Sequence, residues 1–144
     1  MQTAGLEKCS ICTDSEDISG IANKVGYGLM DLRHFGPKKE FLEDIQDGIK
    51  VCELLEEGWK AFHDEKDIRA EAMPASVYMV TKAIRSGQFL LRPKHFEKIA
   101  NEAKDTRRLI KVLLANPEGF PKNKVAKCQA FFATVTGAFL MRKG

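Results

Sequence analysis

The apolar residues of this chain recur every three or four positions over long segments, and this spacing is typical of amphipathic α-helices. No segment of useful length alternates between apolar and polar residues with the period of two that predicts a β-strand. The clearest helical pattern covers about residues 37–63, where most intervening side chains are charged. Its apolar residues follow at steps of 4, 4, 3, 3, 4 and 3, namely Phe41, Ile45, Ile49, Cys52, Leu55, Trp59 and Phe62.

Proline and glycine mark the ends of four further segments with the same period. The first follows Asp14 or Ser15, either of which can cap a helix, and it ends before Gly36 and Pro37. Two later helices open at Pro93 and Pro121, because proline suits the first turn of a helix, and the first of them stops at Asn116 and Pro117. The remaining helix ends at Gly87, and the sequence leaves two possible starts for it. It starts at Asp64 or Asp67 and is bent at Pro74, or it starts at Pro74 itself.

These segments predict an all-α fold, a single-domain helical bundle of four to five amphipathic helices. Residues 1–13 have turn-like composition without an apolar period, so we expect a flexible N-terminal tail followed by a bundle domain over residues 14–144. A chain of 144 residues with 44% apolar composition can bury enough surface to fold without disulfides or a structural metal.

Cysteine use and the start of the chain favour a cytoplasmic, intracellular location. Cys52 and Cys128 fall within apolar helical patterns, where a free thiol behaves as a small hydrophobic group. Residues 1–17 show neither the basic opening nor the apolar run of a secretory signal. The longest uncharged stretch, residues 128–141, has 14 residues and is too short to span a bilayer comfortably, so no membrane partner is expected.

Cys9 and Cys12 form a CxxC motif, whose two thiolates can bind one zinc ion or close a redox disulfide. A structural zinc site needs four ligands, and the sequence holds no second Cys/His pair. A thioredoxin-type site needs a preceding strand, which the pattern does not predict. The motif is therefore interpreted as a pair of ordinary tail thiols, with a zinc-dependent or thiol-redox regulatory protein as an alternative function.

No catalytic residue can be assigned from the sequence. It shows no recognisable Ser-His-Asp or Cys-His set, no glycine-rich phosphate loop and no HExxH motif. A di-iron bundle would need Glu-x-x-His pairs from separate helices, whereas the nearest match is the single run from Asp31 to His34. An enzyme with a site gathered from scattered residues remains an alternative, and no cofactor is expected apart from the zinc considered above.

Charge is divided unequally along the chain. Residues 1–72 hold 9 Lys and Arg against 16 Asp and Glu, a net charge of −7, whereas residues 73–144 hold 14 against 4, a net charge of +10. The two halves can neutralise each other within the fold, or they can present an acidic and a basic surface to different partners. The second reading also allows self-association, with the basic half of one copy against the acidic half of the next.

The basic half carries the candidate binding site. Within residues 93–115, five cations fall opposite the apolar stripe, although Glu97 and Asp105 share that face and Lys98 can pair with Glu102. Phe89, Phe120 and Tyr78 are too few, and too plausibly buried, to form a base-stacking platform. The alternative is an ordinary solvated helix face. The candidate nucleic-acid-binding residues are Arg92, Lys94, Lys98, Lys104, Arg108, Lys111, Lys122, Lys124 and Lys127.

Together these features predict a non-enzymatic interaction or assembly subunit. Its basic C-terminal half is expected to contact a polyanion, either RNA or DNA, or the acidic surface of a protein partner. Contacts to phosphate would be independent of base sequence and would weaken steeply with salt.

Overall fold

The computed structural model describes residues 18–64, 69, 71 and 73–142, and within these residues the chain forms five α-helices and no β-strand. This arrangement confirms the predicted all-α bundle. The expected tail over residues 1–13, with Asp14 and Ser15, lies outside the described residues, as does Asp67. The helices are α2 (Ile18–Phe35), α3 (Lys39–Asp64), α4 (Ala75–Arg85), α5 (Pro93–Ala115) and α6 (Lys122–Ala138).

The helix ends follow the glycine and proline signals. Gly36 and Gly87 have φ angles of 83° and 73°, a left-handed conformation that glycine adopts without steric cost, and they terminate α2 and α4. The Gly36 amide donates to the carbonyl of Leu32 at 2.9 Å, and the Gly87 amide donates to the carbonyl of Ile84 at 3.1 Å. These bonds satisfy carbonyl groups that the helix ends would otherwise leave unpaired.

The prediction that the helix ending at Gly87 could start at Asp64 is wrong. Asp64 is the last residue of α3, and α4 begins only at Ala75, with Pro74 in the N-cap position. Pro74 therefore marks a start and does not bend a longer helix. Its fixed φ suits a helix entrance, whereas inside a helix its missing N–H would remove a hydrogen bond.

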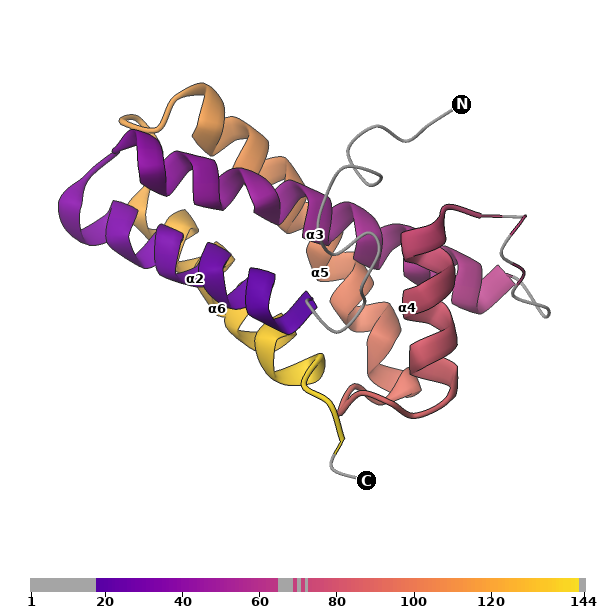
Figure 1. Ribbon diagram of the computed structural model, residues 1–144. Coiled ribbons are helices and arrows are strands. Elements are labelled where there is room, and N and C mark those ends of the chain that lie inside the picture. Colours follow the sequence, from indigo (N-terminus) through magenta and orange to yellow (C-terminus); the bar gives the residue numbers. More distant parts are fainter. Residues whose placement is uncertain (1–17, 65–68, 70, 72, 143–144) are drawn as a thin grey trace.

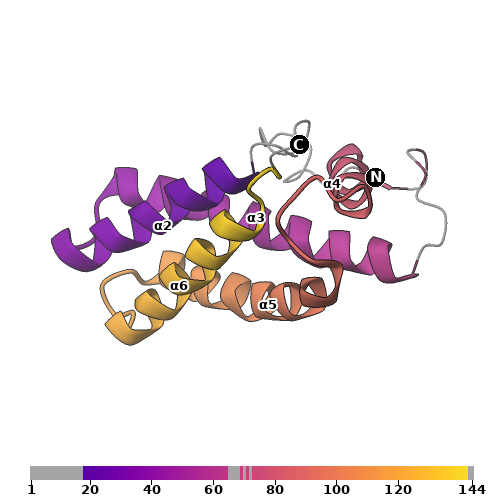
Figure 2. The same ribbon diagram turned by 90° about the horizontal axis from the view of Figure 1, so that it is seen from below.

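Four helices run side by side, and α4 crosses the C-terminal half of α3 (Figures 1 and 2). Helix α2 packs against both α3 and α6, α5 packs mainly on α3, and the contact between α5 and α6 is less extensive. Since α2 is enclosed on two sides, it belongs to the bundle.

The interior is filled by apolar side chains from every helix, as the spacing predicts. Phe96 of α5 lies at the centre of an aromatic group, with its ring centroid 5.6 Å from those of both Trp59 and Phe62 in edge-on geometry. Edge-to-face contacts of this kind add about 0.5–1.5 kcal/mol per pair to the hydrophobic effect. The group joins α3 to the first turns of α5.

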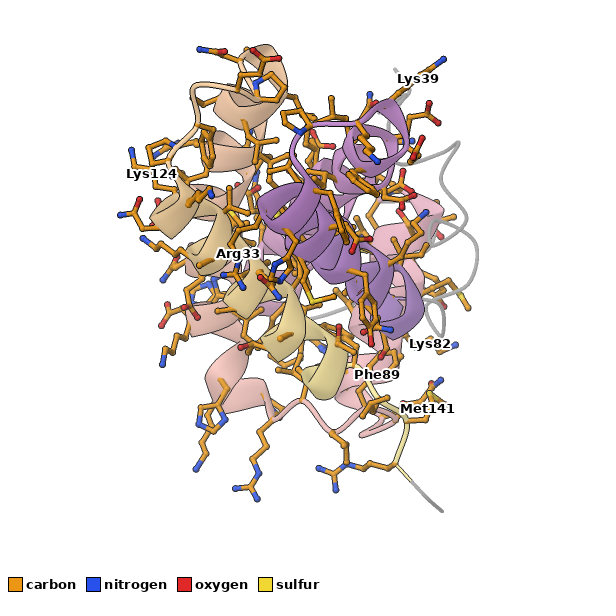
Figure 3. The ribbon with its side chains drawn as sticks, turned by 90° about the vertical axis from the view of Figure 1, so that its left-hand side faces the viewer. Arg33, Lys39, Lys82, Phe89, Lys124 and Met141 are labelled. Atoms are coloured by element: carbon orange, nitrogen blue, oxygen red, sulfur yellow. The ribbon has the colours of Figure 1, made fainter. Side chains whose placement is uncertain are left out.

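The segment between α4 and α5 is fastened to the residues that follow α6. Phe89 and Met141 form an isolated antiparallel bridge and lie next to each other in Figure 3. The Leu90 amide donates to the carbonyl of Leu140 at 2.9 Å, and the Leu91 amide donates to that of Ala138 at 2.7 Å. These bonds hold the start of α5 against the end of α6.

Gly48, in the middle of α3, lies close to side chains from three other helices. A Cβ atom placed there would lie 2.8 Å from the ring of Phe132, 3.0 Å from Ile110 and 3.0 Å from Val25. These neighbours come from α6, α5 and α2 respectively. The absent side chain therefore allows the four long helices to converge at one point.

Replacing Gly48 with alanine should destabilise the protein, whereas the same change at Gly20 should stabilise it. At Gly48 the added methyl group displaces buried side chains, and the net loss is about 1–2 kcal/mol after the gain in helix propensity. At Gly20, near the start of α2, the added Cβ meets nothing within 4 Å, so only the propensity gain of roughly 0.5 kcal/mol remains. Urea unfolding followed by circular dichroism measures both changes, and equal shifts in the two variants would contradict the close packing at Gly48.

Candidate functional site

The structure places all nine candidate cations at the surface. Arg92 directly precedes α5, five of the others lie on α5 and three lie on α6, and each is exposed. Helix α5 has 23 residues and is therefore about 34 Å long. Its buried residues form a single stripe, so the cations lie away from the core as the helical period predicts.

Few of these cations are neutralised by carboxylates. Within the part of the chain that the structure describes, Arg108 is the one member of the nine with a carboxylate oxygen inside 4.0 Å, its Nη1 lying 3.9 Å from Asp105. The expected pair between Lys98 and Glu102 is not formed at that distance. Both side chains are exposed, so an i,i+4 pair gains too little to hold them in one geometry.

Acidic residues interrupt the cations on the α5 surface, as the sequence indicates. Glu97, Glu102 and Asp105 are all exposed. Glu102 and Asp105 line a hollow of about 280 Å³ between α5 and α6, and Lys127 lines it from the other side. The surface is therefore cationic overall but mixed along its middle.

One ion pair joins the acidic and basic halves of the chain in the described residues. Arg107 of α5 donates from Nε to Glu56 Oε2 of α3 at 2.6 Å, and from Nη2 to Oε1 at 3.1 Å. The hydrogen bonds to Glu56 raise the pKa of the Arg107 guanidinium. Because this two-point contact links helices 51 residues apart in the sequence, no local pattern could reveal it. Among the described residues, this is the ion pair within 4.0 Å that links the two halves.

Two cations before α5 have partners elsewhere. Lys82 lies over the ring of Tyr78, with its Nζ atom 5.5 Å from the ring centroid. Arg85 lies over the ring of Phe62 at 5.4 Å and donates to the carbonyl of Phe62 at 3.4 Å. These contacts hold the Lys82 side chain against α4 and the Arg85 side chain against α3.

The start of α6 adds to the positive surface. Lys122 and Lys124 lie in the first turn, which contains no acidic residue, and Pro121 provides no side-chain cap for the free N–H groups. The positive end of the helix dipole therefore coincides with two exposed lysines. Lys124 projects from α6 on the opposite side of the molecule from Lys39 at the start of α3 (Figure 3).

The aromatic residues considered for base stacking do not form a platform. Phe89 and Phe120 are buried, and Tyr78 is half-buried. Large apolar side chains that are exposed include Tyr27 and Phe35, both on α2. Among the described residues, the α5–α6 surface therefore presents no exposed Phe, Tyr or Trp side chain.

The two described cysteines are buried and unpaired. Burial raises the pKa of the Cys128 thiol to about 11, and burial together with the nearby carboxylate of Glu56 raises that of Cys52 well above its ordinary value. Both thiols are therefore protonated and unreactive at neutral pH. Cys9 and Cys12 lie outside the described residues, and the described part of the chain contains no group of three or more His, Cys, Asp or Glu side chains arranged to hold a metal ion.

No family model matches the chain, no curated protein is similar to it at a significant level, and no solved structure matches its fold. Among the described helices, none combines the length and apolar character needed to cross a membrane. Function must therefore be inferred from the fold and its surface.

The raised pKa of Cys128 predicts a loss of stability in alkali. Above pH 9.0, the ordinary pKa of a thiol, the unfolded chain loses this proton while the folded chain keeps it to about pH 11. The free energy of unfolding therefore falls with rising pH in this window, by roughly 2 kcal/mol from this group. Urea unfolding at pH 9 and pH 11 should show a larger fall for the wild type than for Cys128→Ala, and equal falls would contradict the assignment.

Proposed function

We propose that this protein is a non-enzymatic interaction subunit that binds nucleic acid, through the phosphate backbone, on its cationic α5–α6 surface. The observation that carries the proposal is the state of the nine cations: all are exposed, and only Arg108 has a described carboxylate within 4.0 Å. Such side chains can replace the counterions condensed on a polyanion, and release of those ions drives binding.

The shape of the surface supports phosphate over an acidic protein as the partner. The cations are spread along the roughly 34 Å of α5 and the first turns of α6, which suits a long, evenly charged ligand. The interspersed Glu97, Glu102 and Asp105 reduce the number of phosphates held at once. With no aromatic platform on this surface, binding is expected to be moderate in affinity and independent of base sequence.

Binding should weaken steeply with salt, and removal of three cations from this surface should reduce the salt dependence. The test variant is Lys104→Gln/Lys111→Gln/Lys124→Gln. Each lost phosphate contact lowers the slope of log affinity against log salt by about 0.9 for duplex DNA, so the triple variant should lose about 2–3 from the wild-type slope. Fluorescence anisotropy with short labelled RNA and DNA duplexes measures the slopes.

The matched control also removes three positive charges, but from the acidic half of the chain. Lys38, Lys39 and Lys60 are exposed on or next to α3, and their replacement by glutamine should leave the slope unchanged. Equal effects of the two triple variants, or no binding by the wild type even at low salt, would refute the proposal. Polyglutamate serves as a polyanion without phosphate. If the protein binds polyglutamate as tightly as it binds RNA, the partner is an acidic protein and not a nucleic acid.

Self-association through opposed charges is a second candidate, because the single described ion pair between the halves leaves the exposed acids of α3 available. Light scattering at low and high salt tests it. A mass above that of one chain at low salt, falling to that of one chain at high salt, is expected if basic and acidic surfaces of neighbouring copies meet. A single-chain mass at every salt concentration would exclude charge-driven assembly.

A further inference from the structure

A hollow of about 360 Å³ lies where α5 begins and α6 ends, and the segment between α4 and α5 forms its third wall. Its volume falls within the range of small-molecule sites, about 300–1,000 Å³. Leu91, Ile99 and Ala138 provide apolar surface, whereas Arg92, His95 and Lys98 provide the polar side. The hollow thus combines a hydrophobic surface with positive charge.

The apolar walls are held in place by the fold. Leu91 and Ile99 are each only 5% exposed, so the core fixes their side chains. The backbone bonds from Leu90 to Leu140 and from Leu91 to Ala138 fasten the linker wall to the end of α6. The ring of Phe89 contacts that of Phe139 at 5.1 Å behind this junction. A ligand would therefore contact Leu91 and Ile99 without a cost for ordering these two side chains.

The positive groups at the hollow have no partner of their own among the described residues. Neither Arg92 nor Lys98 has a carboxylate oxygen within 4.0 Å, although Glu102 also lines the hollow. Arg92 and Lys98 together exceed the charge of Glu102 by one. A guanidinium can hold a carboxylate or phosphate with two parallel hydrogen bonds, which a neutral head group cannot match.

We propose that this hollow binds a small amphiphilic anion, whose apolar chain packs on Leu91, Ile99 and Ala138 and whose head group lies between Arg92 and Lys98. We expect the ligand to be a free anion and not a lipid within a membrane. Three chain segments border the hollow and limit it to the size of a small molecule. The proposed ligand differs from nucleic acid, although the hollow shares Arg92 and Lys98 with the proposed nucleic-acid surface.

The experiment is a titration with decanoate below its micellar concentration, followed by calorimetry and by ¹H–¹⁵N correlation spectra. Decanoate should bind with the largest amide shifts at Leu91, Lys98, Ile99 and Ala138, and decanol should bind about tenfold more weakly or not at all. Equal affinity for decanol, shifts confined to other surfaces, or no binding of decanoate would overturn the proposal.

Three variants separate the head-group and chain contacts. Arg92→Gln/Lys98→Gln should weaken decanoate binding about tenfold or more, and Gly137→Leu should weaken it by filling the hollow, since a Cβ at Gly137 meets nothing within 4 Å. The matched control Lys94→Gln/Lys104→Gln removes two exposed α5 cations outside the hollow and should change the affinity less than about twofold. Thermal unfolding confirms that each variant is folded.

Two further arms distinguish the alternatives. Binding to phosphatidylglycerol vesicles without any response to free decanoate would indicate a membrane lipid head group and would overturn the proposed free ligand. The variant Lys104→Gln/Lys111→Gln/Lys124→Gln should keep decanoate binding while its salt slope for nucleic-acid binding falls by about 2–3. Loss of decanoate binding in that variant would show that general surface charge, and not the hollow, attracts the anion.

Discussion

The convergence of α2, α3, α5 and α6 at Gly48 is the contact on which the bundle most depends. Phe132, Ile110 and Val25 approach this glycine from three different helices and occupy the space that a side chain would take. Interiors packed at crystal-like density tolerate little added volume, so the positions of the four long helices are coupled through this point. In the same bundle, α2 packs against α6, and α5 packs against α3.

This packing leaves nearly all the charged residues outside. The buried residues are apolar apart from Ser76, Thr81 and Thr106, and Arg107 with Glu56 makes the described link between the two oppositely charged halves. The other cations of α5 and α6 contribute little to the stability of the fold, since an exposed ion pair adds only about 0–1 kcal/mol to the free energy of unfolding. Their accumulation on one half of the chain is therefore not required by the described ion pairs of the fold, and it is the feature on which the proposed binding of a polyanion rests.

The helices and most of their ends could be predicted because both depend on neighbouring residues. Glycine at a left-handed position and proline at a first turn act within one turn of helix, as Gly36, Gly87 and Pro93 show. The prediction failed where two local signals competed. Asp64 is a residue type that can cap the start of a helix, but it is the last residue of α3. Pro74 occupies the N-cap position of α4 instead. Likewise, spacing suggested a pair between Lys98 and Glu102, although solvent competes successfully for both.

The exposure of the nine candidate cations could also be predicted, because a residue opposite an apolar stripe faces solvent once that stripe is buried. The hollow beside Leu91 and Ala138 could not. Its walls come from residues 90–102 and 134–138, two segments that are remote in the sequence and are joined by backbone hydrogen bonds that carry no side-chain signature.

The sequence by itself thus determined the helices, their ends and which faces carry charge, since helical period and turn chemistry act over a few residues. Tertiary structure alone decided that Arg107 meets Glu56, that residues 89–91 are fastened to the end of α6, and that Arg92 and Lys98 border an apolar hollow. The physical reason is that distances between remote segments are set by how side chains such as Phe132 fill the space around Gly48. A local pattern of residues does not contain that information.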